Sequence, residues 1–334
     1  MDYRLPPDVR IQESLVPLSE STSWADELLD IEGAWKQAQG KGVIVCVLDT
    51  GLSNHEDMEG AIIATKDFTG SRHGSADVHG HGSHVSSLIA ARSGNDVGIR
   101  GIAPLCKIVH AKVLGDSGGG GEPGIVAGMQ WGYAQGAHVF SLSLGGGGRM
   151  VQLDGLLAEL RQDAKRRNRP FVALAAAGND GAVLNNPAAQ QGFMAVGAYG
   201  QDGRITRFTS RSAKLKVLGP GVEMLGCLPG NRYGLMSGTS QATPVVAGVV
   251  TLAISKEMEA GSESALLTSE DAEEHILRNA VDAVNGSPFR LVNARKALES
   301  IGVKPIPAPP VDPNRLCGTR VFGPFQGYAV IKVT

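Results

Sequence analysis

The chain has 334 residues and a formal net charge of −2, from 31 Lys and Arg against 33 Asp and Glu. This balance argues against a nucleic-acid-binding protein, whose affinity needs clustered basic residues. A hydrophobic share of 42% is enough for a buried core, which excludes bulk disorder, and the length fits one large α/β domain.

Residues 1–24 form a polar N-terminal extension that contains prolines and lacks a hydrophobic period. Its start, MDYRLPPDVR, has no apolar core of the kind found in signal peptides, and no apolar stretch is long enough to span a membrane. The four cysteines are scattered, without the spacing of a zinc site. These features predict a cytoplasmic protein that contacts neither membranes nor nucleic acid.

Short β-branched runs alternate with helical patterns in the central region, residues 25–302. The runs predict buried strands at 42–49, 107–114, 138–144 and 170–177. Helical spacing predicts helices at 125–135, 151–167 and 241–254, and an acidic run predicts another that begins near 269 with Ser269 as its cap. Apolar strands separated by helices indicate an α/β fold, with a mostly parallel central sheet and helices on both faces.

Beyond this region, residues 303–313 contain five prolines (VKPIPAPPVDP) and predict an extended linker. The tail ends in YAVIKVT, a plausible edge strand. The chain therefore divides into an extension at 1–24, a central domain at 25–302, and a linker with a short tail at 303–334.

Three residues suited to nucleophilic catalysis lie at the ends of predicted elements. Asp49 ends the first strand, His81 precedes a helical stretch, and Ser240 opens the apolar helix. A serine hydroxyl becomes an effective nucleophile when an imidazole takes its proton and a carboxylate orients that imidazole. A helix N-terminus at Ser240 would also favour a developing negative charge.

These motifs and their order make residues 25–300 resemble the subtilisin-like serine proteases (subtilases), closest in character to intracellular subtilisins. The segments similar to the family's aspartate, histidine, serine and oxyanion-hole motifs are Asp49-Thr50-Gly51, His81-Gly82-Ser83-His84-Val85, Gly238-Thr239-Ser240-Gln241-Ala242-Thr243-Pro244 and Ala176-Ala177-Gly178-Asn179. The resemblance implies a subtilisin-like fold and a broad-specificity serine endopeptidase. Asp49, His81 and Ser240 would form its triad, Asn179 would bind the oxyanion, and no cofactor would be required for chemistry.

The same resemblance implies protein or peptide substrates that bind against two backbone segments. These are Gly118-Gly119-Gly120 and Ser143-Leu144-Gly145. Gln241 stands where the family usually has methionine, so we expect lower sensitivity to oxidants. The oligomeric state is not readable from the sequence.

Subtilases commonly bind structural calcium, and Asp57 and Asn95 are the candidate ligands here. Oxygen ligands suit calcium, but Arg92 and Arg100 flank this loop and are unfavourable charges. The alternative is an ordinary solvated turn at Asn95-Asp96.

Several alternatives remain open. Asp49-Thr50-Gly51 and Asp116-Ser117-Gly118 could be the two motifs of an aspartic protease, and His79, His81 and His84 resemble part of a zinc motif in which Ser83 replaces an aspartate. Structural hydrogen bonding is the alternative for His79 and His84. A peptide ligase or macrocyclase, or a catalytically silent binding scaffold, could use the same fold.

The extension resembles the short N-terminal segment of intracellular subtilisins that lies across the active-site cleft. Residues 11–18 could pair with the backbone that binds substrate, and Pro17 would then misplace a nearby peptide bond because it lacks an N–H. Surface packing or disorder of the extension is the alternative.

Overall fold

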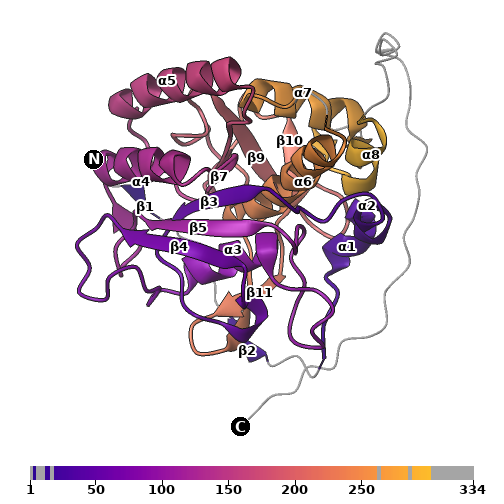
Figure 1. The fold of residues 1–334 in the computed structure, drawn as a ribbon, viewed down its shortest axis with the longest axis horizontal. Helices are drawn as coiled ribbons and strands as arrows, with labels where there is room; N and C mark the ends of the chain where they lie inside the picture. The colour runs from indigo at the N-terminus through magenta and orange to yellow at the C-terminus, as the bar shows by residue number, and fades with distance from the viewer. Residues whose placement is uncertain (1–2, 5–11, 16–18, 262–264, 285–287, 302–334) are drawn as a thin grey trace.

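The computed structural model describes residues 3–4, 12–15, 19–261, 265–284 and 288–301; the predicted linker and tail lie outside them. A nine-stranded sheet forms the centre (Figure 1), in the order β13-β14-β10-β9-β8-β7-β3-β5-β4. All neighbouring strands in it are parallel except β13 and β14. The strands are β3 (Ile44–Asp49), β4 (Ile62–Asp67), β5 (Lys107–Lys112), β7 (Val139–Leu142), β8 (Val172–Ala176), β9 (Phe193–Tyr199), β10 (Val217–Pro220), β13 (Val281–Asp282) and β14 (Arg290–Leu291).

Helices cover both faces of this sheet, so its central strands contribute to two cores. In β3, Val45 and Val47 pack into one core, while Cys46 and Leu48 pack into the other. The first core includes residues of α1 (Trp24–Leu29), α2 (Ile31–Trp35), α3 (His81–Ala90), α6 (Thr239–Glu259), α7 (Ser269–Asn279) and α8 (Ala294–Glu299). The second includes residues of α4 (Glu122–Ala134) and α5 (Val151–Arg167), which lie together above the sheet in Figure 1. The predicted α/β fold class, with a mostly parallel central sheet and helices on both faces, is confirmed.

Most predicted elements are present, with shifted ends. The helix predicted at 151–167 is α5 without change, whereas α6 begins two residues earlier than predicted and runs to Glu259. The predicted cap Ser269 is wrong. Thr268 caps α7 through a capping box with Asp271, and the Ser269 hydroxyl accepts the N–H of Ala173 in β8 instead.

Two small sheets involve the N-terminal extension. Strand β2 (Gln12–Leu15) pairs with β12 (Arg232–Met236), which pairs with β11 (Met224–Leu228). Strand β1 (Tyr3–Arg4) pairs with β6 (Gly119–Gly120). The prediction that residues 11–18 pair with the substrate segments is wrong for Gln12–Leu15, which joins β12, and Tyr3–Arg4 occupies that edge instead. Residue 11 and residues 16–18, including Pro17, lie outside the described residues.

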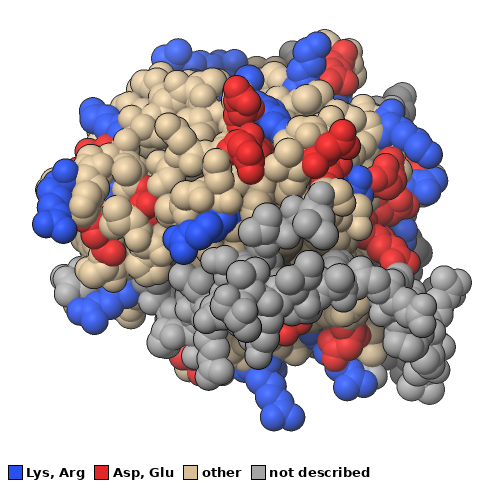
Figure 2. Space-filling view, turned by 90° about the horizontal axis from the view of Figure 1, so that it is seen from below, with Lys and Arg blue, Asp and Glu red and all other residues tan. Residues whose placement is uncertain are grey.

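The sheet places Asp49, Ser143 and Asn179 at one edge, because they end or follow β3, β7 and β8, which are parallel neighbours. No helix among the described residues is both long and apolar enough to cross a bilayer. Acidic and basic side chains are interspersed on the face drawn in Figure 2.

Candidate active site

Asp49 and His81 form a buried pair at the carboxyl end of β3. Nδ1 of His81 lies 2.7 Å from Oδ1 of Asp49, and neither residue is exposed. Burial alone would raise the pKa of Asp49. The charge and hydrogen bond of His81, with the N–H of Thr50, outweigh burial and hold this pKa below its ordinary value. The ionised carboxylate thus orients the imidazole, and the buried Nε2 has no partner among the described residues.

Ser240 lies in the first turn of α6, beside the segment that follows β7. Its hydroxyl donates to the carbonyl of Ser143 at 3.3 Å, and the Ser143 hydroxyl donates to the carbonyl of Ser240 at 2.7 Å. In a regular helix this carbonyl would accept the N–H four residues later, but Pro244 has none. The proline therefore leaves a free acceptor, which Ser143 uses to attach the segment 143–145 to Ser240.

Asn179 follows β8 and faces the start of α6. Its side-chain oxygen accepts the N–H of Thr239 at 2.9 Å and the Thr239 hydroxyl at 2.8 Å, which fixes the orientation of the amide. The amide nitrogen is buried and has no partner among the described residues. Such an unpaired donor is costly, so it indicates a place for an acceptor that forms during a reaction. Sequence analysis missed the role of Thr239, because its motif does not reveal which residue orients the amide.

The two predicted substrate segments flank an extended piece of the N-terminal extension. Tyr3 pairs with Gly120 and Arg4 with Gly119 in antiparallel register. The N–H of Arg4 donates to the Gly145 carbonyl at 3.2 Å, and the Gly145 N–H donates back at 3.4 Å. Tyr3 is 1% exposed, and its hydroxyl donates to the carbonyl of Gly148 at 3.1 Å. Both segments can therefore hold an extended chain between them.

Gly118 and Leu144 are the remaining members of the two substrate segments, and each fixes the backbone of its segment. Gly118 has a φ of +79°, and its N–H donates to the carbonyl of Gly115 in the turn before β6. Such a φ favours glycine. Leu144 is fully buried in the core that contains α4 and α5.

The predicted calcium ligands lie together. Nδ2 of Asn95 donates to Oδ1 of Asp57 at 3.0 Å, and the N–H of Ile99 donates to Oδ2 at 2.7 Å. Burial raises the pKa of Asp57 to about 6 despite these bonds, and the negative charge of Glu20 adds to the effect. Sequence analysis did not anticipate Glu20.

The two arginines regarded as unfavourable for calcium are engaged elsewhere. Arg92 donates to the carbonyls of Glu59 and Pro104, and Arg100 pairs with Asp26 and Glu32. The charge of Arg100 is therefore compensated by two carboxylates, whereas Arg92 binds neutral carbonyls. The carboxylates of Asp57 and Glu20 are oxygen groups of the kind that calcium prefers. The Asn95 amide turns its nitrogen to Asp57, and its oxygen accepts the N–H of Val97 at 3.2 Å.

The alternative motifs do not form competing sites. Asp116 pairs with Lys112 and His73, each at 2.9 Å, so it does not share a proton with Asp49 as in an aspartic protease. In the described part of the chain, no three His, Cys, Asp or Glu side chains are placed to hold a metal. The structural interpretation of His84 is confirmed by bonds from Nε2 to the Met224 and Gly234 carbonyls, at 3.0 and 3.1 Å.

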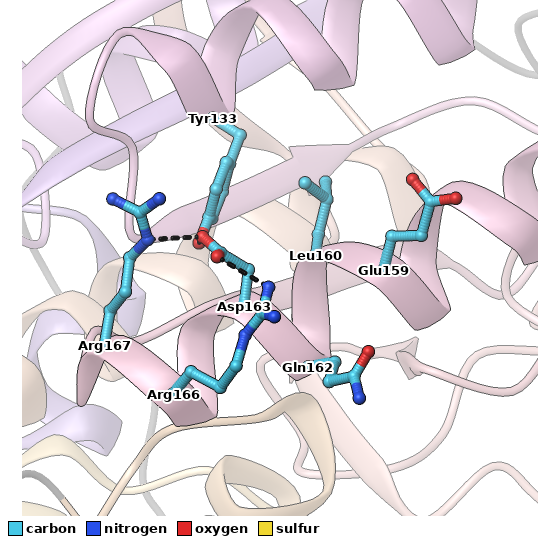
Figure 3. Close-up of a pocket in the computed structure, with 7 residues that line it drawn as sticks. All are labelled: Tyr133, Glu159, Leu160, Gln162, Asp163, Arg166 and Arg167. Atoms are coloured by element: carbon cyan, nitrogen blue, oxygen red, sulfur yellow. Dashed lines mark hydrogen bonds and ion pairs between the residues drawn. The ribbon is translucent and has the colours of Figure 1, made fainter.

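A hollow of about 430 Å³ lies elsewhere, between α4 and α5. Figure 3 shows Tyr133, Arg166 and Arg167 gathered around Asp163, which accepts the Tyr133 hydroxyl at 2.8 Å. This network contains no nucleophile next to a base. A second hollow of about 380 Å³ borders Gly119 and Gly120 and so adjoins the site described above.

Comparisons with known proteins identify the family. A model described as the subtilase family matches residues 40–296. The chain is 35% identical over 237 residues to M-protease of Shouchella clausii. The matched region is 70% of this chain and 60% of that protein. The chain is also 35% identical over 236 residues to Subtilisin Savinase of Lederbergia lenta, covering 70% of this chain and 84% of that protein.

Thermitase of Thermoactinomyces vulgaris is similar over a longer stretch. The identity is 32% over 289 residues, which is 85% of this chain and 98% of that protein. All four matched regions include the greater part of the central domain.

Proposed function

This chain belongs to the subtilase family, and on that premise we propose that it is a serine endopeptidase of broad specificity. The observation that carries the proposal is the buried Asp49–His81 pair, at 2.7 Å, whose imidazole Nε2 has no partner in the described part of the chain. The unpaired amide nitrogen of Asn179 and the position of Ser240 at a helix start support it further.

In the proposed reaction, His81 takes the proton of the Ser240 hydroxyl, and the Ser240 oxygen attacks the carbonyl carbon of the substrate. Asp49 keeps the imidazole in the tautomer with Nδ1–H and stabilises its charged form. Asn179 Nδ2 and the backbone N–H of Ser240 donate to the oxyanion. His81 then protonates the leaving amine, and water repeats the sequence on the acyl-enzyme.

Substrates would bind as an extended strand between β6 and Gly145. The support is the pairing of Tyr3 and Arg4, which already make antiparallel contacts with both edges. Because main-chain hydrogen bonds supply the contacts, many sequences could bind, which suits protein or peptide substrates of varied sequence.

The extension, residues 1–24, would inhibit the enzyme by occupying this cleft. A chain that starts at Ser23 should then have a higher initial rate than the full chain, and the full chain should show a lag as it is trimmed. Tyr3→Ala should shorten the lag, because the Tyr3 side chain is 1% exposed and anchors β1. Equal initial rates without a lag would contradict inhibition.

A structural calcium ion would be held by Asp57, Asn95 and Glu20. It would compensate negative charge at the loop and take no part in the chemistry. Calcium should raise the midpoint of thermal unfolding, and Asp57→Asn should abolish that increase. An unchanged midpoint in the wild-type protein would contradict the proposal.

Mass spectrometry of an unfolded protein substrate after incubation tests the proposed activity. We expect new peptide termini at many sequences, and none with Ser240→Ala. Joined peptides in the presence of an added amine nucleophile would favour a ligase instead. A folded protein that yields neither product would be a silent scaffold.

A further inference from the structure

A second histidine lies behind the catalytic pair. His110, in β5, is fully buried, and β5 runs parallel to β3 with Val47 opposite His110 and Lys112 opposite Asp49. Nε2 of His110 lies 3.2 Å from the backbone nitrogen of Gly51, two residues after Asp49. Its Nδ1 lies 3.2 Å from the hydroxyl oxygen of Ser86 in α3.

The hydrogen-bond partners of His110 determine its tautomer. The Ser86 hydroxyl donates to the carbonyl of Gly82 at 2.7 Å, and a carbonyl can only accept, so the single hydroxyl proton is used there. The Nδ1 of His110 must then donate to Ser86. Its Nε2 must accept, because Gly51 offers a backbone N–H. The arrangement requires a neutral ring with its proton on Nδ1.

This ring connects the two segments that carry the catalytic pair. On one side it binds Gly51, next to Thr50, whose N–H donates to Asp49 Oδ1 at 2.7 Å. On the other side it reaches Gly82, next to His81, through Ser86. Gly51 has a φ of +118° and no room for a Cβ, which would meet the Ser75 carbonyl at 2.7 Å, so this turn has few alternative positions.

We propose that His110 is a positioning residue, which holds the turn at Asp49 and the helix start at His81 in their mutual geometry. The inference rests on the proposed peptidase function. It goes beyond the triad, because His110 touches no reacting atom.

Charge on the ring would disrupt this arrangement, because Nε2–H would then face the Gly51 N–H. Burial lowers the pKa of His110 to about 4 even though Asp49 and Asp77 favour the charged form; Lys112 and His81 oppose it. The neutral ring therefore persists over the pH range in which a histidine base works.

The tautomer can be tested without any activity. In the full-length Ser240→Ala protein labelled with ¹⁵N-histidine, long-range ¹H–¹⁵N spectra should show His110 neutral, with its proton on Nδ1, at pH 7 and at pH 5. A proton on Nε2, or a charged ring at pH 7, would overturn the inference even if the enzyme is a peptidase.

Kinetics of two full-length variants, measured after any initial lag, test the consequence. His110→Leu removes the acceptor for Gly51, and we expect kcat to fall roughly tenfold or more with KM changed less than about twofold, since small misplacements of catalytic groups are costly. His110→Gln keeps a neutral acceptor and donor and should lose less than about threefold.

A matched control is His138, whose Nδ1 accepts the N–H of Ile44 at 3.1 Å at the other end of β3. His138→Leu should leave kcat unchanged while lowering thermal stability. A normal kcat in His110→Leu, or equal losses in His110→Leu and His110→Gln, would overturn the inference. Absence of peptidase activity in the wild-type protein, with the expected tautomer observed, would instead contradict the proposed function.

Discussion

The proposed role of Asn179 depends on which way its side-chain amide is turned. Thr239 occupies the amide oxygen with two hydrogen bonds, so the nitrogen is the group left to meet a developing oxyanion. We therefore expect the amide nitrogen to donate a hydrogen bond in the transition state and to contribute little to binding of the ground-state substrate.

We therefore expect Asn179→Ala to lower kcat by about 10² to 10³ with little change in KM, a magnitude carried over from the corresponding donor of subtilisin. Steady-state kinetics on a peptide substrate measure both parameters. A large rise in KM with an intact kcat would make Asn179 a ground-state binder.

Gln241, next to Ser240, gives a second prediction at this scale. It is fully buried, and its Nε2 lies 3.7 Å from the sulfur of Met236. A thioether beside the nucleophile would form a polar sulfoxide, so Gln241→Met should be inactivated faster by peroxide than the wild-type protein. Residual activity against time of exposure measures this, and equal rates would place the main oxidative damage elsewhere.

At the scale of elements, the sequence predicted those helices and strands whose formation depends on a local residue pattern. The buried strands were visible as β-branched runs, and α5 was predicted correctly because Leu153, Leu156, Leu157 and Leu160 share one buried face. The cap of α7 was misassigned by one residue, since Thr268 and Ser269 are chemically similar and the sequence does not show that Thr268 forms the capping box while Ser269 binds Ala173.

Thr268→Ala should lower the free energy of unfolding by about 1 kcal/mol, because it removes the capping box at the start of α7. Urea denaturation measures the change. Ser269→Ala serves as a comparison that deletes a sheet contact and leaves the cap. An unchanged stability in Thr268→Ala would show that α7 does not depend on its cap.

Contacts between distant segments could not be predicted from local patterns. The order of the motifs predicted the triad, but the connection from His110 to Gly51 exists only because β5 lies beside β3 in one register. Likewise, no local pattern reveals that Tyr3–Arg4 pairs with β6 while Gln12–Leu15 pairs with β12.

At the scale of the whole molecule, buried neutral histidines link stability to pH. Burial lowers the pKa of His84 to about 4, with the nearby His81 acting in the same direction, and the buried Nδ1 of His84 has no partner among the described residues. The native state therefore keeps this ring neutral where the unfolded chain binds a proton. The resulting stability is present above pH ~6.5 and is lost as the pH falls towards 4.

His84→Gln should reduce the loss of unfolding free energy between pH 6.5 and 4.5, by up to about 1.4 kcal/mol per pH unit. Comparing the variant with the wild-type protein isolates this residue from Asp26, whose pKa burial raises to about 6 and which acts in the opposite direction. Identical pH dependence in the two proteins would contradict a neutral buried His84.

The proposed peptidase activity is tested most directly by fluorophosphonate labelling, with the modified residue located by mass spectrometry. A form that starts at Ser23 should be labelled at Ser240, the full chain more slowly, and Ser240→Ala not at all. Labelling at another serine, such as Ser117, or no labelling of a folded Ser23 form, would contradict a catalytic role for Ser240.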